Sequence, residues 1–162
     1  MTIGIRKGLL EDLPFVRSLA IRSVSYGIPS GRDVSPEEVG SRLFKALEEL
    51  EVALTLHDDF LLLIAEDSEE NRPVGYLMLF TNEEEGSTGE KQAEIHDLAV
   101  DKGYWGKYVF QKLVARAEEE ARARGIPYIV GHVSVSNERV VLPGIRRMGY
   151  RIERYQLMKR LL

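Results

Sequence analysis

The chain of 162 residues contains no cysteine. Disulfide bonds, thiolate metal ligands and a cysteine nucleophile are therefore excluded. Histidine is scarce as well, and His57, His96 and His132 fall in separate predicted elements without the spacing of a metal site, so we expect no bound metal. The net charge of −4 argues against a nucleic-acid partner, because proteins that bind nucleic acids are usually basic.

Long apolar runs are also missing. No run approaches the roughly 20 residues needed to cross a bilayer, and the opening MTIGIRKG lacks the apolar centre of a secretory signal. We therefore expect no membrane partner and a cytoplasmic location. The length of 162 residues and the hydrophobic content of 44% suit a single domain spanning residues 1–162.

The apolar pattern predicts the order βααβββαβαββ. Strands are predicted at residues 2–6, 60–67, 74–82, 92–100, 127–135, 150–155 and 156–162, and helices at 13–27, 36–54, 107–124 and from 138, with Pro143 and Gly144 disturbing the last. The run at 60–67 is apolar enough to be buried on both faces. Short connections favour a meander of the three central strands. The helix at 107–124 is a crossover that favours parallel pairing of the strands before and after it, at 92–100 and 127–135.

We therefore expect an α/β fold of the α+β type: a mixed, mostly antiparallel central sheet of about six or seven strands, flanked by about four helices.

The stretch GYWGKYVFQKL (103–113) lies between a predicted strand and the long predicted helix. Such a turn gathers unpaired backbone N–H groups at the positive end of the helix dipole, where anionic oxygens bind. Gly106 permits close approach and Lys107 supplies a cation. The P-loop and dinucleotide fingerprints are both absent, so an ordinary helix start explains the turn alone equally well.

The surrounding residues resemble the GNAT superfamily of acyl-CoA-dependent N-acyltransferases. The resemblance rests on IRKGLLEDLPFV, PVGYLMLF, AEIHDLAVDKGYWGKYVFQKLVARAEEEARARG and SNERVVLPGIRRMGY. It implies a GNAT-like fold and acetyl-CoA as cosubstrate. It also implies the residues that hold the cofactor: Leu98, Ala99 and Val100 on a splayed strand, Trp105, Gly106, Lys107, Tyr108, Val109 and Phe110 at the pyrophosphate turn, and Asn137 beside the pantetheine arm.

The turn departs from the family pattern, which is usually Q/R-x-x-G-x-G/A. In the ungapped register Trp105 replaces Gln or Arg, Tyr108 replaces the first glycine, and Phe110 replaces Gly or Ala. The backbone donors survive such substitutions, but a Cβ and an aromatic ring then lie beside the phosphates. The resemblance therefore implies a degenerate acetyl-CoA loop.

Glu94 and His96 are the candidate catalytic residues. Both side chains lie two apart on a predicted strand and so share a face, whereas Asp97 is expected on the other face. A carboxylate or histidine near the thioester can accept the proton of the acceptor amine. The resemblance supports both, because family members carry a glutamate base at one or other of these positions. The family's tyrosine acid is missing, since Ile145 stands in its place, and Tyr150 and Tyr155 are expected to be packing residues.

A nucleotide- or phosphometabolite-binding α/β domain would use the same helix terminus, but it ranks last because no nucleotide motif is present. Two functions remain open. One is an N-acetyltransferase that moves an acetyl group from acetyl-CoA to a primary amine of a small molecule or peptide, which the element order and the strand, turn and helix at 92–125 support. The alternative is a catalytically impaired CoA-binding or regulatory module, which the altered turn and Ile145 support. A homodimer formed through a sheet edge is compatible with either function.

Overall fold

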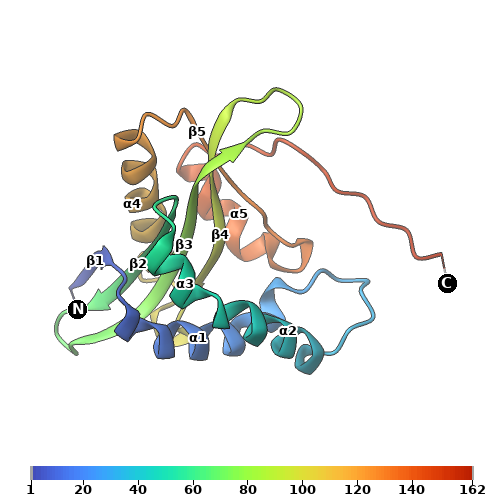
Figure 1. Cartoon of the computed structure of the whole chain (residues 1–162). Helices are drawn as coiled ribbons and strands as arrows, with labels where there is room; N and C mark the ends of the chain where they lie inside the picture. Colours follow the sequence, from blue (N-terminus) through green and yellow to red (C-terminus); the bar gives the residue numbers. More distant parts are fainter. Residues whose placement is uncertain (1, 162) are drawn as a thin grey trace.

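A mixed sheet of five strands forms the centre of the computed structural model, which describes residues 2–161 (Figure 1). The strands follow one another in space as in the chain: β1 (Ile3–Lys7), β2 (Phe60–Asp67), β3 (Arg72–Glu84), β4 (Lys91–Val100) and β5 (Tyr128–Gly131). The pairings from β1 to β4 are antiparallel, and β5 lies parallel to β4. The predicted meander and the predicted parallel pairing are both confirmed.

The helices begin and end close to their predicted positions. They are α1 (Leu13–Gly27), α2 (Pro36–Glu48), α3 (Leu50–Leu56), α4 (Val109–Ala123) and α5 (Glu138–Arg147), with short 3-10 turns η1 (Leu10–Asp12), η2 (Lys102–Tyr104) and η3 (Val135–Asn137). The single helix predicted at 36–54 is divided at Glu49 into α2 and α3. In residues 2–161 no helix has the length and apolar character needed to span a membrane.

A local signal starts α2. The Ser35 hydroxyl accepts a hydrogen bond of 3.1 Å from the Glu38 N–H, and the Glu38 carboxylate accepts one of 2.9 Å from the Ser35 N–H. Pro36 occupies the first helical position, where its missing N–H costs nothing. This reciprocal cap confirms the predicted helix start.

The core has two layers, one on each face of the sheet. Helix α4 covers one face and α1, α2 and α3 cover the other. Along β2, Leu61 and Leu63 pack toward α4, while Leu62 and Ile64 pack toward α1, so the predicted burial on both faces is confirmed. Each such fully buried aliphatic side chain contributes about 1.5–3 kcal/mol to stability.

The C-terminal segment differs from the prediction, because none of residues 150–161 is in a strand. The segment extends away from the body in Figure 1. The side chains of Tyr155 and Leu157 are 82% and 91% exposed, so the prediction that Tyr155 is a packing residue was wrong. Alternation in the sequence predicts which side chains share a face of a strand, but a strand also needs a neighbouring strand to pair with. The neighbouring edge strand, β5, is only four residues long and offers little for residues 150–161 to pair with. The sheet thus has five strands among the described residues. Leu162, the end of the last predicted strand, lies outside them.

Helix α5 also differs from the prediction, since it continues through Pro143 and Gly144. Pro143 removes only one helical hydrogen bond, the one its N–H would donate to the Arg139 carbonyl. Because Arg139 is exposed and lies in the first turn of α5, water can solvate that carbonyl.

Candidate active site

A β-bulge in β4 rearranges the candidate catalytic residues. Asp97 pairs with Met78 of β3, but Ile95 pairs with the very next residue of β3, so His96 is an extra residue in the strand. An extra residue interrupts the alternation of side chains between the two faces. Asp97 therefore lies on the face that carries Glu94, and its expected position on the opposite face was wrong.

Hydrogen bonds show the new position of Asp97. Its Oδ2 accepts a hydrogen bond of 2.6 Å from the hydroxyl of Tyr76, which is fully buried in the core layer beneath α1. Its Oδ1 accepts one of 2.9 Å from the Leu98 N–H. Burial and the Asp97 carboxylate raise the pKa of Tyr76 far above its usual value, so Tyr76 remains a hydrogen-bond donor at all working pH values.

Glu94 and His96 do share a face, as predicted. The Nδ1 of His96 lies 3.7 Å from Oε1 of Glu94, and the side chains are 57% and 26% exposed. The His96 ring also meets Phe80 edge to face, with 5.2 Å between ring centroids. Both side chains thus reach solvent, and the structure adds Asp97 as a carboxylate on the same face. The sequence carries no visible signal for this addition, because the bulge depends on the pairing with β3.

The edge of β4 facing β5 opens just after Ile95. The parallel pairing ends at Ile95 and Gly131, whereas β4 itself continues to Val100. Alternate backbone N–H and C=O groups between His96 and Val100 therefore point to an edge that no described strand covers. The splayed strand expected around Leu98, Ala99 and Val100 is present, with Ala99 buried and its two neighbours half-buried.

The turn after β4 is anchored by one buried side chain. The hydroxyl of Tyr104 donates a hydrogen bond of 2.9 Å to Oδ2 of the buried Asp67. Burial together with the Asp67 hydrogen bond raises the pKa of Tyr104 to about 12. The Lys107 ammonium lies 4.7 Å from the centroid of the Tyr104 ring. A cation–π contact thus holds the one cation of residues 103–108 against the fixed ring.

The backbone of this turn favours glycine at two positions. Gly106 has a φ of +75°, and Tyr108, the residue before α4, has φ +61° and ψ 12°. Left-handed backbone is costly for a residue with a Cβ. Tyr108 therefore lies where the resemblance expects a glycine, and its conformation is one that glycine adopts readily.

The first turn of α4 offers free backbone donors. The first N–H of the helix to find a carbonyl four residues back is that of Lys112, which donates to the Tyr108 oxygen at 3.1 Å. The N–H groups of Val109, Phe110 and Gln111 precede it and have no such acceptor. The Val109 side chain is buried, and that of Phe110 packs against the core beneath α4. The geometry suits an anion.

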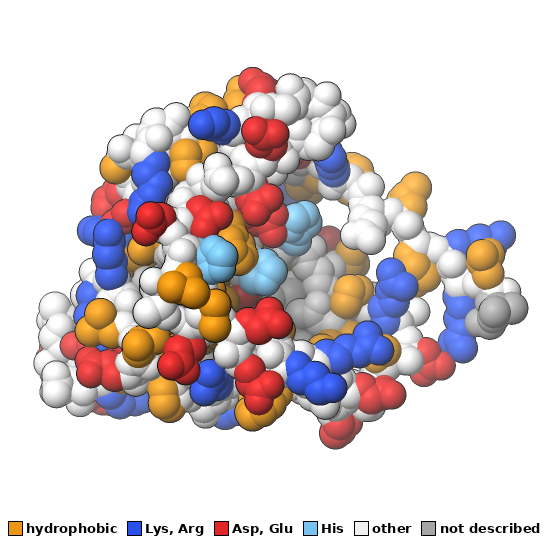
Figure 2. Space-filling view, viewed as in Figure 1, with side chains coloured by type: hydrophobic (Ala, Val, Ile, Leu, Met, Phe, Trp, Pro, Cys, Tyr) orange, Lys and Arg blue, Asp and Glu red, His pale blue; other side chains and the backbone are white. Residues whose placement is uncertain are grey.

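A cleft of about 2610 Å³ joins the opened strand edge to this turn. The residues of the expected cofactor site that line it are Leu98, Ala99, Val100, Trp105, Gly106, Tyr108, Val109, Phe110 and Asn137. His96 and Asp97 line it as well, whereas Glu94 and Lys107 are outside its lining. Figure 2 shows it as a hollow between the body and the C-terminal segment. That segment forms one wall, which accounts for a volume above the usual 300–1,000 Å³ of ligand pockets.

Asn137 lies at the predicted start of the last helix but does not cap it with its side chain. It precedes α5, and its backbone N–H donates to the Ser134 oxygen at 2.9 Å. The neighbouring Ser136 hydroxyl donates to the Ile28 carbonyl at 2.8 Å and so ties this segment to the end of α1. Asn137 itself lines the large cleft.

The three histidines, separated in sequence, gather on one face of the molecule (Figure 2). Among residues 2–161, however, no group of three or more histidine, aspartate or glutamate side chains is arranged to hold a metal ion.

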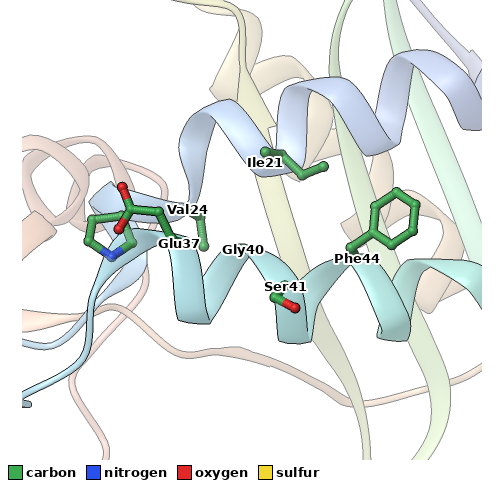
Figure 3. Close-up of a pocket in the computed structure, with 7 residues that line it drawn as sticks. Ile21, Val24, Glu37, Gly40, Ser41 and Phe44 are labelled. Atoms are coloured by element: carbon green, nitrogen blue, oxygen red, sulfur yellow. The ribbon is translucent and has the colours of Figure 1, made fainter.

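A second hollow, of about 480 Å³, lies between α1 and α2 (Figure 3). Its lining consists of Ile21, Val24, Pro36, Glu37, Gly40, Ser41 and Phe44, and it shares only Val24 with the large cleft. Glu37 is the only ionisable residue of this lining, so the hollow lacks a second group for acid–base chemistry.

At the large cleft an opened strand edge adjoins a helix N-terminus and a face with ionisable side chains. The chain belongs to the acetyltransferase (GNAT) family, whose sequence model matches residues 31–150. Members of this family use acetyl-CoA and acetylate amines. Of the two functions that the sequence left open, the enzyme is therefore the one supported.

Solved structures share the whole fold. A GCN5-related N-acetyltransferase from Ralstonia eutropha JMP134 superposes with a TM-score of 0.76 at 21% identity, over 99% of each chain. A transcriptional regulator from Bacillus halodurans C-125 has a TM-score of 0.73 at 18% identity, over 99% of this chain and 100% of that one. Glucosamine-6-phosphate N-acetyltransferase from Arabidopsis thaliana has a TM-score of 0.65 at 19% identity, over 99% of each. At these identities the likeness shows the fold alone.

No curated protein matches the sequence.

Proposed function

We propose that this protein transfers an acetyl group from acetyl-CoA to a primary amine of a small molecule or peptide, within the large cleft. The observation that carries the proposal is the opening of β4 beyond Ile95 beside the free N–H groups of α4. The open edge suits the extended amide-bearing arm of CoA, and the helix N-terminus suits its pyrophosphate. Asn137, across the cleft, is in a position to add an amide contact to the arm.

The proton chemistry is assigned to the face of β4 that carries Glu94, His96 and Asp97. An alkyl amine is protonated at neutral pH, as lysine is. Glu94 or His96, directly or through one water, takes that proton. The nitrogen lone pair then forms a bond to the thioester carbonyl carbon, the carbon–sulfur bond breaks, and the electron pair leaves with sulfur. Because Ile145 replaces the family's tyrosine, the departing thiolate takes its proton from water or from the acylated nitrogen.

The phosphate-binding turn is proposed to be altered rather than lost. Its donors are backbone N–H groups, which do not depend on side chains. Tyr108 nevertheless adds a Cβ and a ring, 71% exposed, beside the place where phosphate oxygens would lie. Replacing Tyr108 with glycine is expected to tighten acetyl-CoA binding.

The test has two stages. Calorimetry with acetyl-CoA measures binding, and release of free thiol with a panel of alkylamines, diamines, amino sugars and peptides then identifies an acceptor. With that acceptor, Glu94→Gln and His96→Ala are each expected to lower the rate by about 10²–10⁴-fold, which is the usual contribution of a general base. Glu119→Gln, on the exposed side of α4, is the matched control and should leave the rate unchanged. Unchanged rates in both site variants would refute the assignment of the base.

A further inference from the structure

Trp105, the only tryptophan in the chain, lies across the opened edge of β4. Its indole N–H donates a hydrogen bond of 2.9 Å to the carbonyl of Val100, the last residue of β4. The edge beyond Ile95 is otherwise uncovered by any described strand. An extended ligand along this edge could donate a hydrogen bond to the Val100 carbonyl. In this structure the Trp105 side chain already donates to it.

Helix α1 holds Trp105 in this position. The ring of Tyr26 meets the indole edge to face, with 5.2 Å between centroids and 73° between planes. Arg22, one turn earlier, lies 3.5 Å from the carboxylate of Asp101 at the start of the same loop. An edge-to-face ring pair and a partly exposed ion pair each contribute little to stability.

The Trp105 side chain can therefore move away from Val100 at a small cost in free energy. It is 46% exposed and belongs to neither buried core layer. No core cavity would form if the indole swung outward, since its outer side already faces solvent. The interactions lost would be the hydrogen bond to Val100 and the ring contact with Tyr26. A ligand that donates to the Val100 carbonyl replaces the lost hydrogen bond.

We propose that Trp105 fills the part of the cleft that the pantetheine arm of CoA occupies, and that an amide N–H of the arm replaces the indole N–H at the Val100 carbonyl. This rests on the proposed function, since it requires CoA to bind along β4. Trp105 is then a residue that sets cofactor affinity: each binding event must break its contacts with Val100 and Tyr26. The nucleotide half of CoA, which lacks the arm, has no reason to move it.

Tryptophan fluorescence tests this directly, because Trp105 is the only emitter of its kind. Acetyl-CoA and CoA are expected to shift and change the emission with the same saturation curve that calorimetry gives. The matched ligand is 3′-phospho-ADP, which carries the same pyrophosphate and adenine without the arm. It should bind by calorimetry and leave the emission unchanged.

Variants give a second readout. Trp105→Phe keeps an aromatic ring but removes the N–H that competes for Val100, so acetyl-CoA should bind about two- to tenfold more tightly, while 3′-phospho-ADP should bind as before. Tyr26→Ala should also tighten acetyl-CoA binding, and Tyr26→Phe, which keeps the ring, should not.

The outcomes are distinguishable. Saturation by acetyl-CoA in calorimetry without a change in Trp105 emission overturns this inference and leaves the proposed function standing. Unaltered affinity in Trp105→Phe does the same. Absence of acetyl-CoA binding in calorimetry refutes the proposed function and this inference with it.

Discussion

The left-handed backbone at Tyr108 leads to a prediction about the sign of a stability change. Tyr108 has φ +61°, which costs a residue with a Cβ about 1–2 kcal/mol. Glycine avoids this cost but loses about 0.5–1 kcal/mol more in backbone entropy on folding than alanine. Tyr108→Gly should therefore be more stable than Tyr108→Ala by about 0.5–1 kcal/mol. Both variants lose the same ring, so ring burial cancels from the comparison.

At an ordinary helical position the order is reversed. Glu119 lies inside α4 with its side chain 65% exposed, so Glu119→Gly should be less stable than Glu119→Ala by about 1 kcal/mol. Urea unfolding of the four variants gives both differences, and for a chain of this size 1 kcal/mol moves the melting temperature by about 2–4 °C. If Tyr108→Ala equals or exceeds Tyr108→Gly in stability, the turn before α4 does not have this backbone geometry.

Three further variants test other parts of the structure. Ser35→Ala removes the hydroxyl that caps α2 and should lower the free energy of unfolding by about 1 kcal/mol, measured by urea titration; no loss would contradict the cap. Burial opposes ionisation of Asp12, but its hydrogen bonds with Arg6, of 2.7 and 2.8 Å, and with a backbone N–H outweigh burial and hold the pKa of Asp12 below its usual value. The stabilisation is then complete above the unfolded pKa of about 3.9 and is lost as pH falls through the lower folded value. Asp12→Asn should accordingly lower the free energy of unfolding by about 1 kcal/mol at neutral pH, a modest loss because solvent screens Arg6. The loss should become smaller as the pH falls. An equal loss at every pH would contradict the ion pair of Asp12 with Arg6. Pro143→Ala restores an N–H donor to the Arg139 carbonyl and should raise stability by about 1–2 kcal/mol, with a corresponding gain in helical circular dichroism; a loss of stability would argue against a continuous α5.

Much of the fold was predictable because its signals are local. The cap of α2 involves Ser35 and Glu38, three residues apart. The buried stripe of α4 at Val109, Leu113 and Ala117 follows from helical spacing alone. The turn before α4 was placed correctly for the same reason, since strand, turn and helix are consecutive in the chain. Each of these features depends on residues that contact near neighbours.

The candidate site was predictable only in part. Glu94 and His96 were placed on one face by alternation, and the fold keeps them there. Asp97 escaped prediction, because the bulge that turns it to the same face exists only in the pairing of β4 with β3. The contact between Trp105 and Val100 also escaped, since an indole can donate in many directions and α1 selects this one.

The sequence by itself determined most of the elements, their order, the capped start of α2 and the position of the turn before α4, because short-range hydrogen bonds and apolar periodicity decide those features. The tertiary structure alone decided where β4 bulges, where β5 leaves it, and which side chains then share the cleft. It also left residues 150–161 without strand partners, although their pattern alternates. The physical reason is the same in each case: pairing between strands and packing between layers depend on residues far apart in the chain, such as Tyr76 and Asp97, whose partners no local pattern specifies.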